Sequence, residues 1–244
     1  PKVGPTYQVG GVNTTHPELY AAVLIVGHAR SLAWKMVCEN LKGRLVDALA
    51  KPNPKGGPQW RVEVFLFLSL KDEDSRKGKV AHKYDETMMQ PCIEILQPVH
   101  VEYMQAVYQP PKDHGCLPGT EPWYITHTRN KTKDFPARIF SQCHRVDLAQ
   151  DFILNVFEPK VHRRYDVFIK ARPDAVYLLE VPPLWRFNLS NLVFPAGGFS
   201  DTWRLGPRTC HVVDPLCTQC ADAIKESCYT GPRKRTTYLD PRVH

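Results

Sequence analysis

The sequence AAVLIVGHARS, residues 21–31, decides the fold of this chain. Six consecutive apolar residues precede Gly27, and a run without polar alternation is typical of a parallel strand buried on both faces. Ser31 is a suitable N-cap, and apolar residues then recur at helical spacing from Trp34 to Leu49, before Pro52. This stretch therefore predicts a strand, a short turn and a helix.

The same alternation of apolar strands and amphipathic helices continues along the chain. Trp60–Leu70 has the pattern of a second buried strand, and the spacing of apolar residues predicts a helix from Pro136 to Pro159. Shorter extended segments are expected at Ile93–Leu96, Val99–Val101, Tyr165–Lys170, Ala175–Leu179 and Leu192–Phe194. The pattern predicts an α/β fold with a mostly parallel central sheet and helices on both faces.

The composition is that of a folded protein with an excess of basic residues. Of the 244 residues, 43% are hydrophobic and 23% are charged, which excludes a mainly disordered chain. No apolar run reaches the roughly 18 residues of a transmembrane helix, so membrane attachment is expected only through an anchor preceding Pro1. The 32 Lys and Arg against 25 Asp and Glu favour acidic partners such as phosphates, nucleotides or polyanions.

Cysteines and glycosylation motifs indicate an oxidising, secretory environment. The chain has eight cysteines, and sequons begin at Asn13, Asn130 and Asn188. Four cysteines near the C-terminus are predicted to form disulfides: Cys210, Cys217, Cys220 and Cys228. Their single C-x₂-C pair leaves a zinc site or free thiols as alternatives, and a cytosolic protein with accidental sequons is the alternative for the compartment. Cys38 and Cys143, on apolar helix faces, are expected to be buried thiols.

Three polar segments follow predicted strands, where sheets of this kind bind ligands. The first, Gly27–Arg30, offers a tight turn, a helix start and a guanidinium for a phosphate. The second is the RPD segment at 172–174, whose carboxylate suits a divalent cation that bridges a diphosphate. The third, Gly197–Gly206, has a Gly-Gly loop before Asp201, which begins a segment capable of forming a helix and whose carboxylate can act as a base or bind sugar hydroxyls. The structural alternatives are an ordinary strand–helix turn, a Pro-Asp turn and an N-cap.

Taken in order, these segments resemble the nucleotide-sugar-dependent glycosyltransferases of the GT-A fold. The matching stretches are VLIVGHARS (23–31), VEVFLFLS (62–69), RRYDVFIKARPDAVY (163–177) and GFSDTWRLG (198–206). Within that fold they are similar to a group in which a short RPD segment stands where other members carry D-x-D. The resemblance implies a GT-A-like, Rossmann-like catalytic domain over residues 21–206. Residues 1–20 are expected to be an N-terminal arm or stem, and 207–244 a cysteine-rich, basic C-terminal extension packed on the same domain.

The resemblance also implies a function. It implies transfer of a sugar from a UDP- or GDP-linked donor to a hydroxyl of a glycan, glycoprotein or glycolipid, in the Golgi lumen and with Mn²⁺ or Mg²⁺. The residues implied to bind the donor are Gly27, His28, Arg30, Arg172 and Gly198. Asp174 and Asp201 are the implied catalytic residues, Asp174 as the metal ligand and Asp201 as the contact to the donor sugar or the acceptor hydroxyl.

Two residues depart from the pattern of that group. His28 stands where Gln is usual, and this puts in question a contact to the ribose or the base. Arg172 stands where D-x-D would place its first Asp, and this puts in question the dependence on a metal. The alternative functions are a nucleotidyltransferase of related fold and a catalytically inactive, secreted carbohydrate-binding or scaffold protein. No nucleic-acid partner is expected, because the basic run Gly231–Arg235 has no interleaved aromatic residues.

Overall fold

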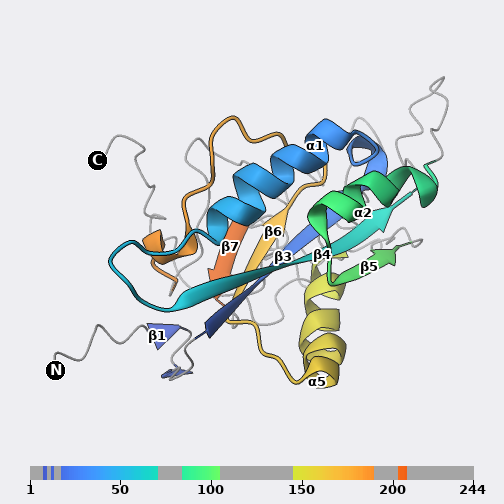
Figure 1. Cartoon of the computed structure of the whole chain (residues 1–244). Coiled ribbons are helices and arrows are strands. Elements are labelled where there is room, and N and C mark those ends of the chain that lie inside the picture. The colour runs from blue at the N-terminus through green and yellow to red at the C-terminus, as the bar shows by residue number, and fades with distance from the viewer. Residues whose placement is uncertain are drawn as a thin grey trace, which may run out of the picture.

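The computed structural model describes residues 8–9, 12–13, 18–70, 84–104, 145–189 and 203–207 of the chain. Its centre is a five-stranded sheet (Figure 1). The strands, in spatial order, are β5 (His100–Tyr103), β4 (Gln59–Ser69), β3 (Glu18–His28), β6 (Val167–Ala171) and β7 (Trp203–Pro207). A separate antiparallel pair is formed by β1 (Gln8–Val9) and β2 (Val12–Asn13).

β3 is the central strand, and from Ala21 to Val26 each of its residues is at most 1% exposed. It pairs in parallel with β4 along its whole length, and it pairs in parallel with β6 on its other side. β5 continues the parallel arrangement beyond β4, whereas β7 runs antiparallel to β6. The sheet is therefore mixed and mostly parallel, which confirms the α/β class expected from the sequence.

The order of the strands creates a topological switch point between β3 and β6. From β3 the chain moves to β4 and then to β5 on one side, and it returns to β6 on the other side. The carboxyl ends of β3 and β6 therefore adjoin, while the connections that leave them diverge. Open α/β sheets bind ligands at such a point.

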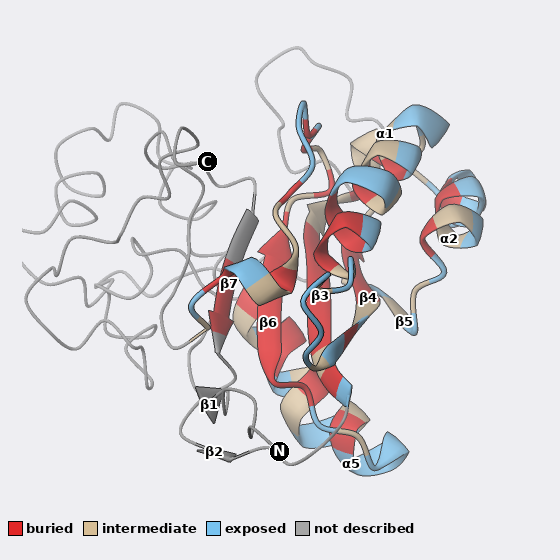
Figure 2. Ribbon diagram, turned by 60° about the vertical axis from the view of Figure 1, so that its left-hand side comes forward, coloured by how far each residue is buried: buried red, intermediate tan, exposed pale blue. Residues whose placement is uncertain are grey.

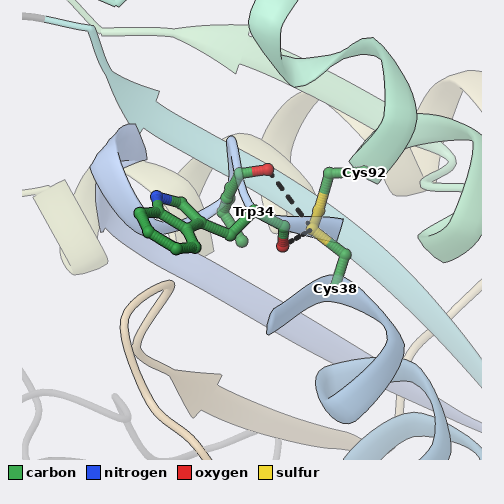
Figure 3. Close-up of a disulfide and its surroundings, with 4 residues drawn as sticks. Trp34, Cys38 and Cys92 are labelled. Atoms are coloured by element: carbon green, nitrogen blue, oxygen red, sulfur yellow. Dashed lines mark hydrogen bonds between the residues drawn. A yellow bond between two sulfur atoms is a disulfide. The ribbon is translucent and has the colours of Figure 1, made fainter. Parts of the chain in front are cut away.

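The first helical layer lies on one face of the sheet (Figure 1). Its elements are α1 (Lys35–Asn40), the π-helical turn η2 (Leu41–Asp47), η3 (Thr87–Met89) and α2 (Gln90–Leu96). Their apolar side chains pack against alternate residues of β3, including Leu19, Val23 and Ile25. A disulfide between Cys38 and Cys92 joins α1 to α2, with Cα atoms 5.3 Å apart (Figure 3). Both cysteines are at most 1% exposed, so this link lies inside the layer.

The second helical layer covers the opposite face and has an aromatic core. Its helical segment at 145–161 ends in η4 (Ile153–Phe157) and α5 (Glu158–Val161). Phe65 contacts Phe157 and Tyr165 edge to face, with ring centroids 4.9 and 5.5 Å apart. Figure 2 shows the buried sheet between the two helical layers. The expected placement of helices on both faces is confirmed.

Two segments that the sequence predicts as strands are not strands. Ile93–Leu96 belongs to α2, and Ala175–Leu179 is irregular. A short apolar run fits a helical turn as well as a strand, so tertiary packing decides between them. The predicted strand at Val99–Val101 is confirmed in part, because β5 covers His100–Tyr103.

Three predicted helix boundaries are also wrong. α1 begins at Lys35 without a side-chain cap, and Ser31 ends the short 3₁₀ turn η1 (Ala29–Ser31) instead. Pro159 does not end the second-layer helix: it lies in α5, directly after the π-helical turn η4, and the helix continues to Val161. The segment after Asp201 forms the strand β7 and not a helix.

The expected buried thiol at Cys38 is wrong as well, because Cys38 is bonded to Cys92. Helical spacing predicts that Cys38 is buried, but it carries no information about a partner 54 residues away. Trp34, which the spacing assigns to the same apolar face, is 65% exposed. Cys143 and the predicted strand Leu192–Phe194 lie outside the described residues.

Candidate functional site

The carboxyl ends of β3 and β6 carry the residues that the sequence analysis singled out. Gly27 and His28 are the last two residues of β3, and Arg30 lies in η1 directly after it. Arg172 and Asp174 follow the end of β6. The fold thus brings these two predicted segments, far apart in the sequence, to the switch point of the sheet.

Gly27 allows the end of β3 and the turn after β6 to approach each other closely. Its φ is +148°, a conformation that residues with a Cβ rarely adopt. A Cβ at this position would lie 3.1 Å from both Cγ and Cδ of Pro173. Glycine is therefore required here for two reasons, its backbone conformation and the contact with Pro173.

Asp174 links the two segments through two arginines. The guanidinium of Arg172 donates to both carboxylate oxygens, from Nε to Oδ1 at 2.7 Å and from Nη2 to Oδ2 at 2.8 Å. Nη2 of Arg30 donates to Oδ2 at 3.4 Å. The fork of Arg172 reaches a carboxylate only two residues away, whereas Arg30 comes from 144 residues away. Together the three side chains connect the ends of β3 and β6.

The charges of this cluster favour the binding of an anion. Hydrogen bonds from Arg172, opposed by burial and supported by Arg30, lower the pKa of Asp174 to about 2. The carboxylate is therefore ionised at neutral pH, and two guanidinium charges less one carboxylate charge leave one net positive charge. The side chains of Arg30 and Arg172 are 39% and 36% exposed, so a dissolved anion can reach them.

Asn40 anchors the segment that follows Asp174, a role that the sequence analysis missed. Its side-chain Nδ2 donates to the carbonyl of Tyr177 at 3.0 Å, and the backbone N–H of Tyr177 donates back to Oδ1 at 2.8 Å. Burial of Tyr177 raises the pKa of its hydroxyl, which therefore stays protonated. An asparagine inside a predicted helix was the available signal, because Asn disfavours helix interiors unless its side chain bonds to backbone.

The observed arrangement does not fit the metal role expected for Asp174. Mg²⁺ and Mn²⁺ require oxygen ligands, and both oxygens of Asp174 already accept guanidinium hydrogen bonds. Within the described ranges of the chain, no cluster of three or more His, Cys, Asp or Glu side chains could hold a metal ion. The requirement for Mn²⁺ or Mg²⁺ remains a prediction from the resemblance.

Three further predicted residues lie in the described part of the chain: His28, Asn13 and Asn188. His28 pairs with Ser69 in the sheet and is partly buried. Of the sequon residues, Asn13 ends β2, and Asn188 is exposed just after the turn η5 (Leu184–Arg186). Other predicted residues lie outside the described part of the chain, and their roles remain predictions: Asn130, Gly198, Asp201, Cys210, Cys217, Cys220 and Cys228.

Comparison with known proteins gives no assignment. No protein-family model matches the chain, and no curated protein is significantly similar to it. The functional argument therefore rests on the arginine–aspartate cluster at the switch point.

Proposed function

We propose that this protein is a glycosyltransferase that moves a sugar from a UDP- or GDP-linked donor to a hydroxyl of a glycan, glycoprotein or glycolipid. One observation carries the proposal: guanidinium groups from the turns after β3 and β6 converge at the switch point of a mostly parallel sheet. A planar guanidinium matches the geometry of phosphate oxygens and carries its charge at every physiological pH. Two such groups, one from each turn, are suited to bind a diphosphate.

The reaction places a specific demand on this site. The bond between the anomeric carbon of the sugar and a diphosphate oxygen breaks, a new bond forms to the acceptor oxygen, and the acceptor proton passes to a base. Negative charge develops on the departing diphosphate, and fixed cations at that position stabilise the transition state. Arg30 and Arg172 are the residues that we assign to this role.

The base in this reaction is a different carboxylate from Asp174. A general base works best when its pKa lies near the working pH, and the arginines hold the pKa of Asp174 at about 2. Asp174 is therefore a poor proton acceptor. We assign the proton transfer to Asp201, which the resemblance implies to contact the donor sugar or the acceptor hydroxyl, and this assignment is part of the proposal.

The proposed location is the lumen of the secretory pathway, such as the Golgi. The buried Cys38–Cys92 disulfide supports it, because disulfides persist mainly in oxidising compartments. Asn188, which begins one of the three sequons, is exposed. In the described part of the chain, no helix is long and apolar enough to cross a membrane.

A thermal-shift screen tests the proposed function. UDP, GDP, CMP and their sugar conjugates are each added with Mn²⁺ and with EDTA, and a ligand at 100 times its Kd should add about 2.7 kcal/mol to the free energy of unfolding. Stabilisation by UDP or GDP and their sugars, followed by release of the nucleoside diphosphate on adding acceptor glycans, is the expected result. Pyrophosphate release from a nucleoside triphosphate would instead identify a nucleotidyltransferase. No stabilisation by any nucleotide would contradict both activities.

Arg30→Ala is the matching site variant for this screen. Loss of one charge-assisted hydrogen bond should weaken the affinity for the stabilising nucleotide by roughly ten- to a hundredfold. Lys160→Ala removes one positive charge from the exposed last turn of α5, outside the site, and is the control for net charge. Equal affinity in both folded variants would remove Arg30 from the site.

A further inference from the structure

We propose, resting on the proposed function, that the site binds the donor diphosphate without a divalent metal and that Asp174 is the internal anion which the diphosphate replaces. In the free protein Arg30 and Arg172 bond to Asp174. In the complex the same two guanidinium groups bond to phosphate oxygens. The arginines then do what a metal does in a site built from carboxylates, namely neutralise the diphosphate.

The hydrogen bonds of the cluster favour this exchange. Arg30 donates to Asp174 through Nη2 at 3.4 Å, which is longer than either hydrogen bond from Arg172. That bond uses one of the five N–H donors of the guanidinium, and the side chain is 39% exposed. Arg30 can therefore turn to a phosphate while Arg172 still holds Asp174, so the exchange can begin with the weaker contact.

The same geometry opposes a cation. A divalent ion at Asp174 would have to displace the two-point hydrogen bond from Arg172. It would also lie beside two guanidinium charges, which repel it. An anion is attracted by both guanidinium charges. Only the carboxylate of Asp174 competes with it for them.

Metal bridging and anion exchange make opposite predictions for Asp174→Asn. If Asp174 holds a bridging metal, removal of its charge weakens nucleotide binding and abolishes the effect of Mn²⁺. If Asp174 competes with the diphosphate, the same change strengthens binding in the absence of metal. The sign of the change in affinity therefore distinguishes the two roles.

Calorimetric titration of the whole chain tests the proposal, with UDP, GDP and inorganic pyrophosphate as ligands, each in EDTA and in Mn²⁺. We expect the parent protein to bind one of the two nucleotides with affinities that agree within threefold in EDTA and in Mn²⁺. Asp174→Asn should bind the same nucleotide about three- to tenfold more tightly in EDTA. Arg172→Ala should bind it at least tenfold more weakly, and Lys160→Ala should bind like the parent.

The outcomes separate this inference from the proposed function. Nucleotide binding that needs Mn²⁺, or that weakens in Asp174→Asn, overturns the metal-free exchange and leaves the glycosyltransferase proposal intact. If neither nucleotide binds, the proposed function fails, and pyrophosphate then decides whether the arginines form an anion site. Absence of pyrophosphate binding in EDTA overturns the inference. Should Asp174→Asn not fold, Arg30→Gln supplies the test, because it must weaken binding equally with and without Mn²⁺.

Discussion

The two ends of the sheet both pair arginines with carboxylates, but they use these pairs differently. At the amino end, Asp166 accepts a hydrogen bond from the backbone N–H of Tyr20 at 3.0 Å, and Glu158 accepts one from the N–H of Tyr165 at 2.7 Å. Glu63 binds both the hydroxyl of Tyr165 and the guanidinium of Arg163. Here Asp166 and Glu158 complete the hydrogen bonding of the backbone around the sheet, whereas Glu63 joins two side chains.

At the carboxyl end, Asp174 accepts hydrogen bonds from the arginines Arg30 and Arg172. The side chain of Asp174 is 21% exposed there, whereas Asp166 and Glu158 are only 8% and 7% exposed at the amino end. A carboxylate that satisfies backbone donors cannot leave without exposing a polar group to an apolar environment. A carboxylate that satisfies solvent-accessible guanidinium groups can be replaced by another anion. The comparison separates a structural end from a binding end.

Removal of the disulfide should lower the free energy of unfolding more than any other change considered for the two ends. It joins α1 to α2, and Sγ of Cys38 lies 3.3 Å from the carbonyl oxygen of Leu32, in the connection that follows Arg30 (Figure 3). Closing a loop of 54 residues stabilises the folded chain by about 4 kcal/mol in the chain-entropy model. The double variant Cys38→Ser with Cys92→Ser should lose up to that amount in urea unfolding. A loss below about 0.5 kcal/mol, within the usual spread of surface changes, would show that the bond does not form.

Gly27→Ala should have the next largest effect, because it strains the binding end alone. The positive φ and the 3.1 Å approach to Pro173 should together cost about 3 kcal/mol. Gly43→Ala is the matched control: a Cβ there meets nothing within 4 Å, and the residue lies inside the helical turn η2. Urea unfolding should show the control to be as stable as the parent or about 0.5–1 kcal/mol more stable. Equal stability of the two variants would contradict the role of Gly27.

Asp166→Ala tests the structural end. Loss of its carboxylate leaves the backbone N–H of Tyr20 without its acceptor and should lower the free energy of unfolding by about 2 kcal/mol. Asp166→Asn keeps an acceptor oxygen and should lose less. Nucleotide affinity should stay at the parent value in both variants, as measured by calorimetry. A tenfold change in that affinity would mean that the two ends are coupled and not separate.

The pH dependence of stability gives the smallest expected effect. The arginines lower the pKa of Asp174 from 3.8 to about 2, so its contribution is complete above pH 3.8 and disappears as the pH falls through 2. Solvent screening at the exposed arginines reduces that contribution to about 1–2 kcal/mol. The parent should exceed Asp174→Asn in stability by this amount at pH 7, and the two should converge near pH 2. A gap that persists at pH 2 would show that charge is not its cause.

Local patterns in the sequence were sufficient to predict the strands β3, β4 and β6, the sheet class and the segments of the site. The continuous apolar run 21–26, ended by Gly27, is typical of a strand buried on both faces of a sheet, and it predicted β3. Arg172 and Asp174 are separated by one proline, so their proximity was also a local property. What these residues face in the folded chain was not local, so the sequence did not reveal that both arginines bond to Asp174.

Only the tertiary structure decided the partners. Arg30 meets Asp174 across 144 residues, and Cys38 meets Cys92 across 54. Periodicity reports which side of an element is buried, but it does not report which other element covers that side. The order β5-β4-β3-β6-β7 supplies this information, because it alone brings the turns after β3 and β6 together. The sequence by itself determined where the charged residues stand along the chain, and the packing of the sheet decided that two arginines share one carboxylate.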